Sequence, residues 1–92
     1  SITIPNRVTR IDEYAFADCT GLTAVALPDG LTKIGDEAFS GCTGLTSVTI
    51  PAGVKKIDWS VFRDCPNLTI HAPAGSYAEQ YAREHNIPFE ME

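Results

Sequence analysis

Residues 11–31 read IDEYAFADCTGLTAVALPDGL, and residues 34–54 read IGDEAFSGCTGLTSVTIPAGV. The two stretches carry the same residue types at positions 23 apart, and a third copy begins at Ile57. A fixed period of this length indicates a stack of supersecondary units, a solenoid, in place of a globular fold around one central core. The repeat therefore predicts the architecture and shifts the functional expectation from catalysis toward binding.

Apolar columns define the core of the predicted stack. Equivalent side chains lie one above another when identical units stack, so each column covers its neighbours. The clearest columns are Ile11, Ile34 and Ile57; Phe16, Phe39 and Phe62; Cys19, Cys42 and Cys65; and Leu22, Leu45 and Leu68. We expect the phenylalanines to form a continuous ladder through the core.

Each unit contains three pieces. The first is a strand with alternating apolar residues, such as Val25 and Leu27, and a proline ends it. The second is a short extended run, residues 31–34 in the second unit, and the third is a helical turn that carries Ala38 and Phe39. The predicted fold is an α/β repeat, a right-handed solenoid with a parallel sheet of about four strands on one side and short helical turns on the other.

Two kinds of helix signal accompany the repeat. Ser76 and Glu79 match the capping box at a helix start, apolar residues within 77–82 share one helix face, and Pro88 prevents continuation. This predicts a C-terminal helix that covers the last coil. Acceptable N-cap residues also occupy one column before each helical turn, namely Asp12, Gly35 and Asp58.

We predict one solenoid domain over residues 1–92, with repeat coils in 1–73 and a C-terminal cap in 74–92. The chain opens in the middle of a unit, because residues 1–5 align with 24–28, and we expect it to be the C-terminal part of a longer array. The first coil would leave an apolar side open, which favours self-association through the N-terminal coil.

The composition argues against two kinds of interaction, with nucleic acid and across a membrane. A formal net charge of -5 argues against nucleic acid, which requires a basic face. No stretch approaches the roughly 18 apolar residues of a membrane span. We therefore expect neither a nucleic-acid partner nor a membrane span in these residues.

The repeat unit resembles a known family. The pattern Ile-x4-Phe-x2-Cys-x2-Leu-x2-Val-x-Leu/Ile-Pro, present from residues 11–31 and 34–54, is similar to the BspA-like (TpLRR) class of leucine-rich repeats. The ending, residues 74–89, is similar to the segment that closes such arrays. Two departures stand out: Val61 replaces the usual alanine, and Trp59 occupies a normally polar column.

The resemblance implies a leucine-rich-repeat solenoid from surface-exposed or secreted proteins, mostly bacterial, whose arrays mediate adhesion or protein interaction. We accordingly expect a non-catalytic interaction module that binds other proteins, host or extracellular-matrix proteins among them. The alternative is a structural spacer or array end-cap with no ligand of its own. No catalytic constellation or cofactor motif appears in the sequence, so we expect neither an enzyme nor a cofactor.

The residues with the most reactive side chains favour structural roles. The cysteine column predicts buried free thiols, with one disulfide or a metal site as less favoured alternatives, because a straight row cannot wrap a metal tetrahedrally. His71 and His85 lack a neighbouring catalytic partner in the sequence, and we place both at the surface.

The exposed side of the main sheet is the candidate binding face. Its residues follow from the strand alternation, because they lie between inward apolar positions. They are Thr3, Ala26, Ser47, Thr49, Thr69 and His71. These side chains are small and mostly polar, and they lack the aromatic and arginine anchors of binding hot spots, which favours a plain solvated sheet face over a binding one.

A column of basic residues forms a second candidate surface. Arg10, Lys33 and Lys56 recur at the repeat spacing, and Asp12 and Asp58 follow directly. One interpretation is a strip that binds an acidic partner. The favoured one is a mixed charged face that keeps the extended runs soluble.

Overall fold

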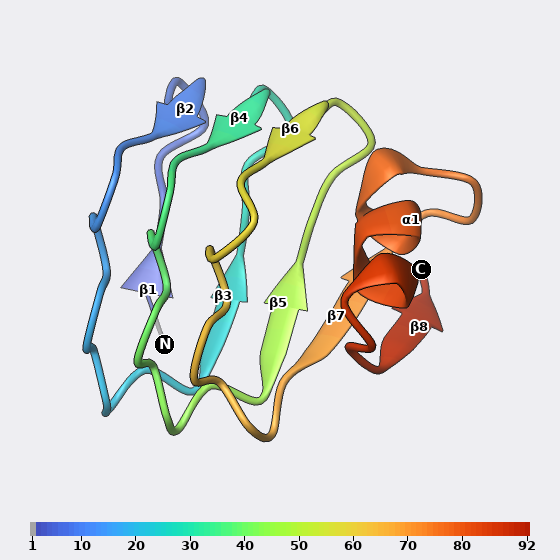
Figure 1. Ribbon diagram of the computed structural model, residues 1–92. Helices are drawn as coiled ribbons and strands as arrows, with labels where there is room; N and C mark the ends of the chain where they lie inside the picture. Colours follow the sequence, from blue (N-terminus) through green and yellow to red (C-terminus); the bar gives the residue numbers. More distant parts are fainter. Residues whose placement is uncertain (1) are drawn as a thin grey trace.

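The computed structural model describes residues 2–92, apart from the side chain of Thr3. The chain winds through successive coils that stack side by side (Figure 1), with the helix at the end of the last coil. Within residues 2–92, no helix combines the length and apolar character needed to cross a membrane. The strands are β1 (Ile2–Thr3), β2 (Arg10–Ile11), β3 (Ala24–Ala26), β4 (Lys33–Ile34), β5 (Ser47–Thr49), β6 (Lys56–Ile57), β7 (Thr69–Ala72) and β8 (Phe89–Met91), and the helix α1 is Tyr77–Glu84.

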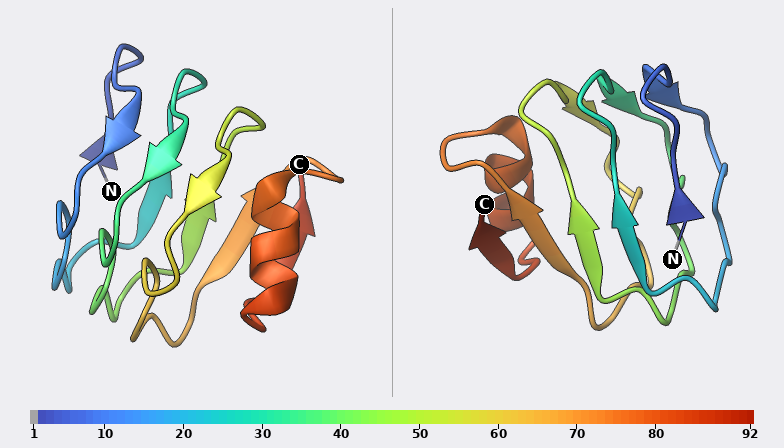
Figure 2. Two further views of the ribbon diagram at one scale, coloured as in Figure 1. Left: turned by 45° about the horizontal axis from the view of Figure 1, so that its top comes forward. Right: turned by 180° about the vertical axis from the view of Figure 1, so that it is seen from behind.

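Two parallel sheets line the solenoid. The larger has five strands in the order β1-β3-β5-β7-β8, and the smaller has three in the order β2-β4-β6 (Figure 2). Val25 pairs with Val48, and Ile34 pairs with Ile57, so the 23-residue columns of the sequence are the register of both sheets. The predicted leucine-rich-repeat solenoid with a parallel sheet and a C-terminal capping helix is confirmed.

The phenylalanine column forms the predicted ladder. The ring centroids of Phe16 and Phe39 lie 5.3 Å apart, those of Phe39 and Phe62 lie 5.6 Å apart, and the planes are nearly parallel at 12° and 10°. Phe39, Ile34, Leu45 and the other central members of the columns are fully buried. Each ring therefore covers the next, and the core is continuous along the stack.

The helical turns of the units are single turns and do not grow into helices. In the second unit Ala38 N–H donates to Gly35 O, and Cys42 N–H donates to Phe39 O, both across three residues. The chain then enters the left-handed region at one column, with φ of 61°, 77° and 60° at Asp18, Gly41 and Asp64. A residue in that conformation ends a helical turn, so the coil turns toward the next strand.

Gly35 begins its turn as expected, since its carbonyl accepts the first hydrogen bond of the turn, and it has a second role. No α-helix begins at its column within the described chain. A Cβ on Gly35 would lie 2.7 Å from the backbone nitrogen of Glu13 in the preceding coil, closer than van der Waals contact allows. Glycine is therefore needed at this position because two backbones approach closely. Asp12, in the same column, is exposed and pairs with Arg10 at 3.4 Å.

Two pairings go beyond the sequence prediction. The extended runs form their own sheet, β2-β4-β6, and β8 adds a fifth strand to the main sheet, for which about four were expected. Ile70 of β7 pairs in parallel with Phe89 of β8. The helix α1 explains this fifth strand, because it carries the chain back so that the next strand can run parallel to β7.

The capping helix closes the last coil with hydrogen bonds as well as apolar contact. Ser76 accepts from the backbone N–H of Glu79 at 3.2 Å, as the capping-box pattern predicts. Tyr77 Oη accepts from the backbone N–H of Ile57 at 3.4 Å. Tyr81 is buried, and its hydroxyl lies 3.0 Å from Asp58 O and 3.1 Å from the carbonyl oxygen of the next residue. The two tyrosine hydroxyls thus tie the helix to backbone groups of the last coil.

The cysteines are free thiols, and two of them hydrogen-bond between coils. Cys42 Sγ donates to Phe16 O, and Cys65 Sγ donates to Phe39 O, each at 3.1 Å in the preceding coil. Cys42 is buried, whereas Cys19 and Cys65 are half-buried, so full burial was predicted correctly for Cys42 alone. Burial raises the pKa of Cys42, and it raises the pKa of Cys65 to about 11.

Replacing Phe39 with alanine tests the ladder. We expect a loss of about 3–5 kcal/mol in the free energy of unfolding, because the fully buried ring leaves a cavity between two stacked neighbours. Urea denaturation followed by circular dichroism measures this loss. Phe16→Ala is the matched control and should cost less, since Phe16 is half-buried and stacks on one described ring. Equal costs for the two variants would contradict the assignment.

Alkylation of Cys65 by iodoacetamide tests the raised pKa of its thiol. At pH 8 the folded chain should react about 100-fold more slowly than the chain in urea, because the pKa of about 11 lowers the thiolate fraction. Peptide mapping by mass spectrometry follows this cysteine alone. Between pH 8 and 10 the rate in the folded chain should keep rising about tenfold per pH unit, whereas in urea it should level off near the ordinary thiol pKa. A folded-state rate that levels off at the same pH would refute the assignment.

Candidate binding surface

The outer face of the main sheet carries the candidate residues. In β3, β5 and β7 the central apolar residues Val25, Val48 and Ile70 are buried, and the residues that alternate with them are exposed or half-buried. The predicted face residues on this outer side are Ala26, Ser47, Thr49, Thr69 and His71. The side chain of Thr3 lies outside the described part of the structure.

Strand register joins these residues into two rows. Ala26 pairs with Thr49, Thr49 with His71, and His71 with Glu90 of β8. A second row holds Ala24, Ser47 and Thr69. Because neighbouring strands lie about 4.8 Å apart, each row is a regular line of short side chains. The five-stranded sheet thus presents methyl and hydroxyl groups on one continuous surface, with charged groups at its β8 end.

The charged end of the rows is a cluster that the sequence analysis missed. His71 Nδ1 lies 3.9 Å from Glu90 Oε1 and 3.9 Å from Glu92 Oε2. The imidazole is 23% exposed, and the carboxylates are much more open to solvent. His71 is therefore half-buried, whereas we expected it at the surface, and it has acidic neighbours. The signal for them was the alternation Phe-Glu-Met-Glu over residues 89–92, which is typical of a half-buried strand.

The cluster can hydrogen-bond or pair with a partner, but its ligand set is incomplete for a metal. Among residues 2–92, no group of three or more histidine, cysteine or acidic side chains has the geometry to hold a metal ion. The imidazole and the two carboxylates instead offer one donor and several acceptors to an approaching polar surface.

The basic column lies on the outer side of the smaller sheet. Arg10 pairs in register with Lys33, and Lys33 with Lys56, and all three are exposed. A shallow hollow of about 350 Å³ adjoins this column, and Glu13 and Asp58 line it together with Arg10 and Lys33. Basic and acidic groups are therefore interleaved on this surface. Such mixing fits the solvated charged face better than a strip selective for an acidic partner.

One comparison with known proteins identifies the family. A model described as a BspA type leucine rich repeat region (6 copies) matches residues 1–79, which is most of the chain. Searches among curated proteins and among solved structures returned no significant match. The chain belongs to the BspA-type leucine-rich repeat family.

Proposed function

We propose that this chain is a non-catalytic protein-interaction module that acts in adhesion and binds its partner across the outer face of the main sheet. The observation that carries the proposal is the pair of in-register rows of short side chains, one of which ends at His71 and Glu90. Leucine-rich repeats generally mediate protein–protein interaction and are not generally catalytic, which supports the coarser part of the proposal.

The physical properties of the face fit a protein partner. Side chains such as Ala26 and Thr49 are short, so a partner can approach the sheet closely along the whole row. Threonine and serine hydroxyls both donate and accept hydrogen bonds, which suits a polar protein surface. The His71–Glu90–Glu92 cluster sits at one end of the row and would fix the orientation of the partner.

Biolayer interferometry against a panel of immobilised host-surface and extracellular-matrix proteins tests this proposal. We expect a saturable signal from at least one of them. Thr49→Arg should weaken that signal about tenfold or more, because a long cation in the centre of the row blocks close approach. Thr43→Arg is the matched control, since Thr43 is exposed on a turn away from the rows, and it should leave the affinity unchanged.

The same measurement can refute the proposal. If both arginine variants weaken the signal equally, the effect comes from added charge and not from the face. If no protein on the panel gives a saturable signal, the chain has no adhesive partner of this class. Circular dichroism of both variants shows whether the fold is retained.

We further propose that the chain works outside the cell or on its surface. The family resemblance supports this location. Intact cells that produce the protein can be treated with a membrane-impermeant amine-reactive biotin reagent. The protein should be recovered among the biotinylated proteins, and its labelling only after lysis would place it inside the cell.

A structural end-cap without a ligand is the second candidate function. It is favoured by the way Tyr77 and Tyr81 pair with the backbone of the last coil, which closes the stack. Under this alternative the face rows would be a plain solvated surface. The interferometry panel separates the two functions, since an end-cap gives no saturable signal with wild-type chain.

A further inference from the structure

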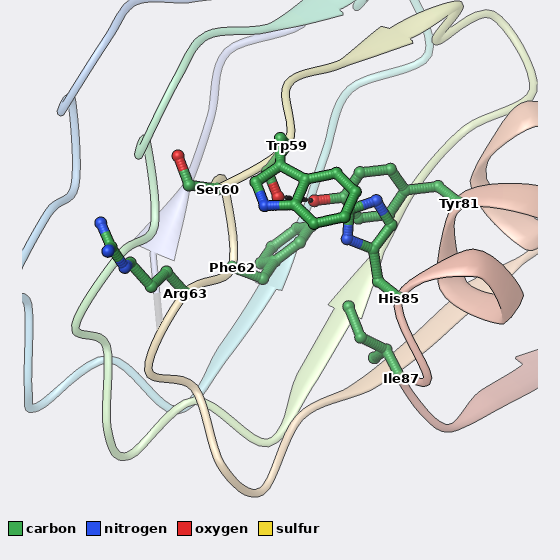
Figure 3. A pocket seen from close by; sticks show the side chains of 7 residues that line it. All are labelled: Trp59, Ser60, Phe62, Arg63, Tyr81, His85 and Ile87. Carbon is green, nitrogen blue, oxygen red and sulfur yellow. Dashed lines mark hydrogen bonds between the residues drawn. The ribbon is translucent and has the colours of Figure 1, made fainter.

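A hollow opens where the last coil meets the capping helix, away from the face rows. Its volume is about 390 Å³, within the range of ligand pockets. Trp59, Phe62 and Arg63 line it from the turn segment of the last coil, and Tyr81 of α1 and His85, the residue that ends the helix, line it from the other side (Figure 3). Two different elements thus contribute to one cavity.

Aromatic rings form rigid walls. The rings of Tyr81 and His85 stack with centroids 3.9 Å apart, and the Trp59 ring lies 4.5 Å from that of His85. Phe62 meets Tyr81 edge-on at 6.2 Å. Ile87 adds an aliphatic group to the lining. Because the Tyr81 hydroxyl is held by backbone carbonyls of the last coil, the apolar part of the hollow is largely preformed.

Trp59 has no evident role in the core. Its side chain is 79% exposed, and the equivalent positions in the preceding coils hold Glu13 and Asp36. An exposed tryptophan beside tyrosine and arginine has the composition of a binding hot spot. This column is therefore acidic in the first two coils and aromatic only in the coil that meets the helix, where the Trp59 ring faces the hollow.

The charged group at the hollow is a cation, and the indole of Trp59 adds a hydrogen-bond donor. Arg63 is 62% exposed, and its contact with Glu37 is a long one of 3.8 Å. The indole N–H of Trp59 is a donor on an exposed ring. Ser60 already donates to Asp36 at 2.5 Å. None of the described side chains that line the hollow is a carboxylate, although the chain as a whole is acidic.

We propose that this hollow binds a segment of a partner protein that presents an apolar side chain next to a carboxylate. The rings and Ile87 would cover the apolar side chain, and Arg63 would pair with the carboxylate. A cationic ligand is disfavoured, because Arg63 would repel it and no carboxylate lines the hollow. A neutral sugar would leave the charge of Arg63 without an anionic group from the ligand. The site is separate from the face rows, so it stands or falls independently of the proposed function.

Three small probes that differ mainly in head-group charge test the ligand class. They are 3-phenylpropionate, 3-phenylpropanamide and 3-phenylpropylamine, with methyl β-glucoside as a sugar probe. The chain contains one tryptophan, so intrinsic fluorescence excited at its absorption edge reports on this hollow alone. We expect 3-phenylpropionate to bind with a dissociation constant in the millimolar range, about three- to fivefold tighter than the amide at low salt.

Substitutions in the hollow and elsewhere test which side chains bind the probes. Arg63→Gln should abolish the preference for the acid over the amide, whereas Arg7→Gln, an exposed arginine of the first coil, should preserve it. Trp59→Ala should weaken all binding in a nuclear magnetic resonance titration without lowering the melting temperature, because the ring is exposed. The proposal is overturned by tighter binding of the amine or the sugar, by equal binding of acid and amide in the wild-type chain, or by no response to any probe.

Discussion

The structure depends on hydrogen bonding between equivalent backbone positions of successive coils. Thr32 N–H donates to Thr9 O, and Lys55 N–H donates to Thr32 O, with the same 23-residue step as the side-chain columns. A buried backbone group without a partner is costly, so each coil fixes the register of the next. The one shortened step, from Val48 to Ile70, keeps both residues inward because the missing residue precedes β7.

The same constraint explains the two ends of the stack. A regular array leaves unpaired backbone groups and an apolar face at each end. At the last coil, Tyr77 and Tyr81 satisfy this requirement with side-chain hydroxyls, and α1 covers the core. Burial raises the pKa of Tyr81, so its hydroxyl stays protonated and continues to donate. The helix then returns the chain to form β8, which extends the main sheet beyond the repeats.

How well each feature could be predicted depends on whether it repeats. The phenylalanine ladder was predictable because three copies of one column reinforce a single interpretation. The close backbone approach at Gly35 could not be predicted, because it involves the preceding coil, which local sequence does not show. The strand β8 and its Glu90 occur once, so no column revealed them. His85 was expected at the surface, but tertiary packing places it half-buried against Tyr81.

The difference between repeating and non-repeating residues determines where in the chain specific binding groups can lie. Residues that repeat, such as Phe39, are held in place by stacking and leave little freedom for change. Residues that break the pattern, such as Trp59 and His71, lie where the last coil meets α1 and β8. At that junction a side chain contacts a non-repeating neighbour, so its chemistry can vary without disturbing the register. The end of the array is therefore where a uniform solenoid can carry distinct binding groups.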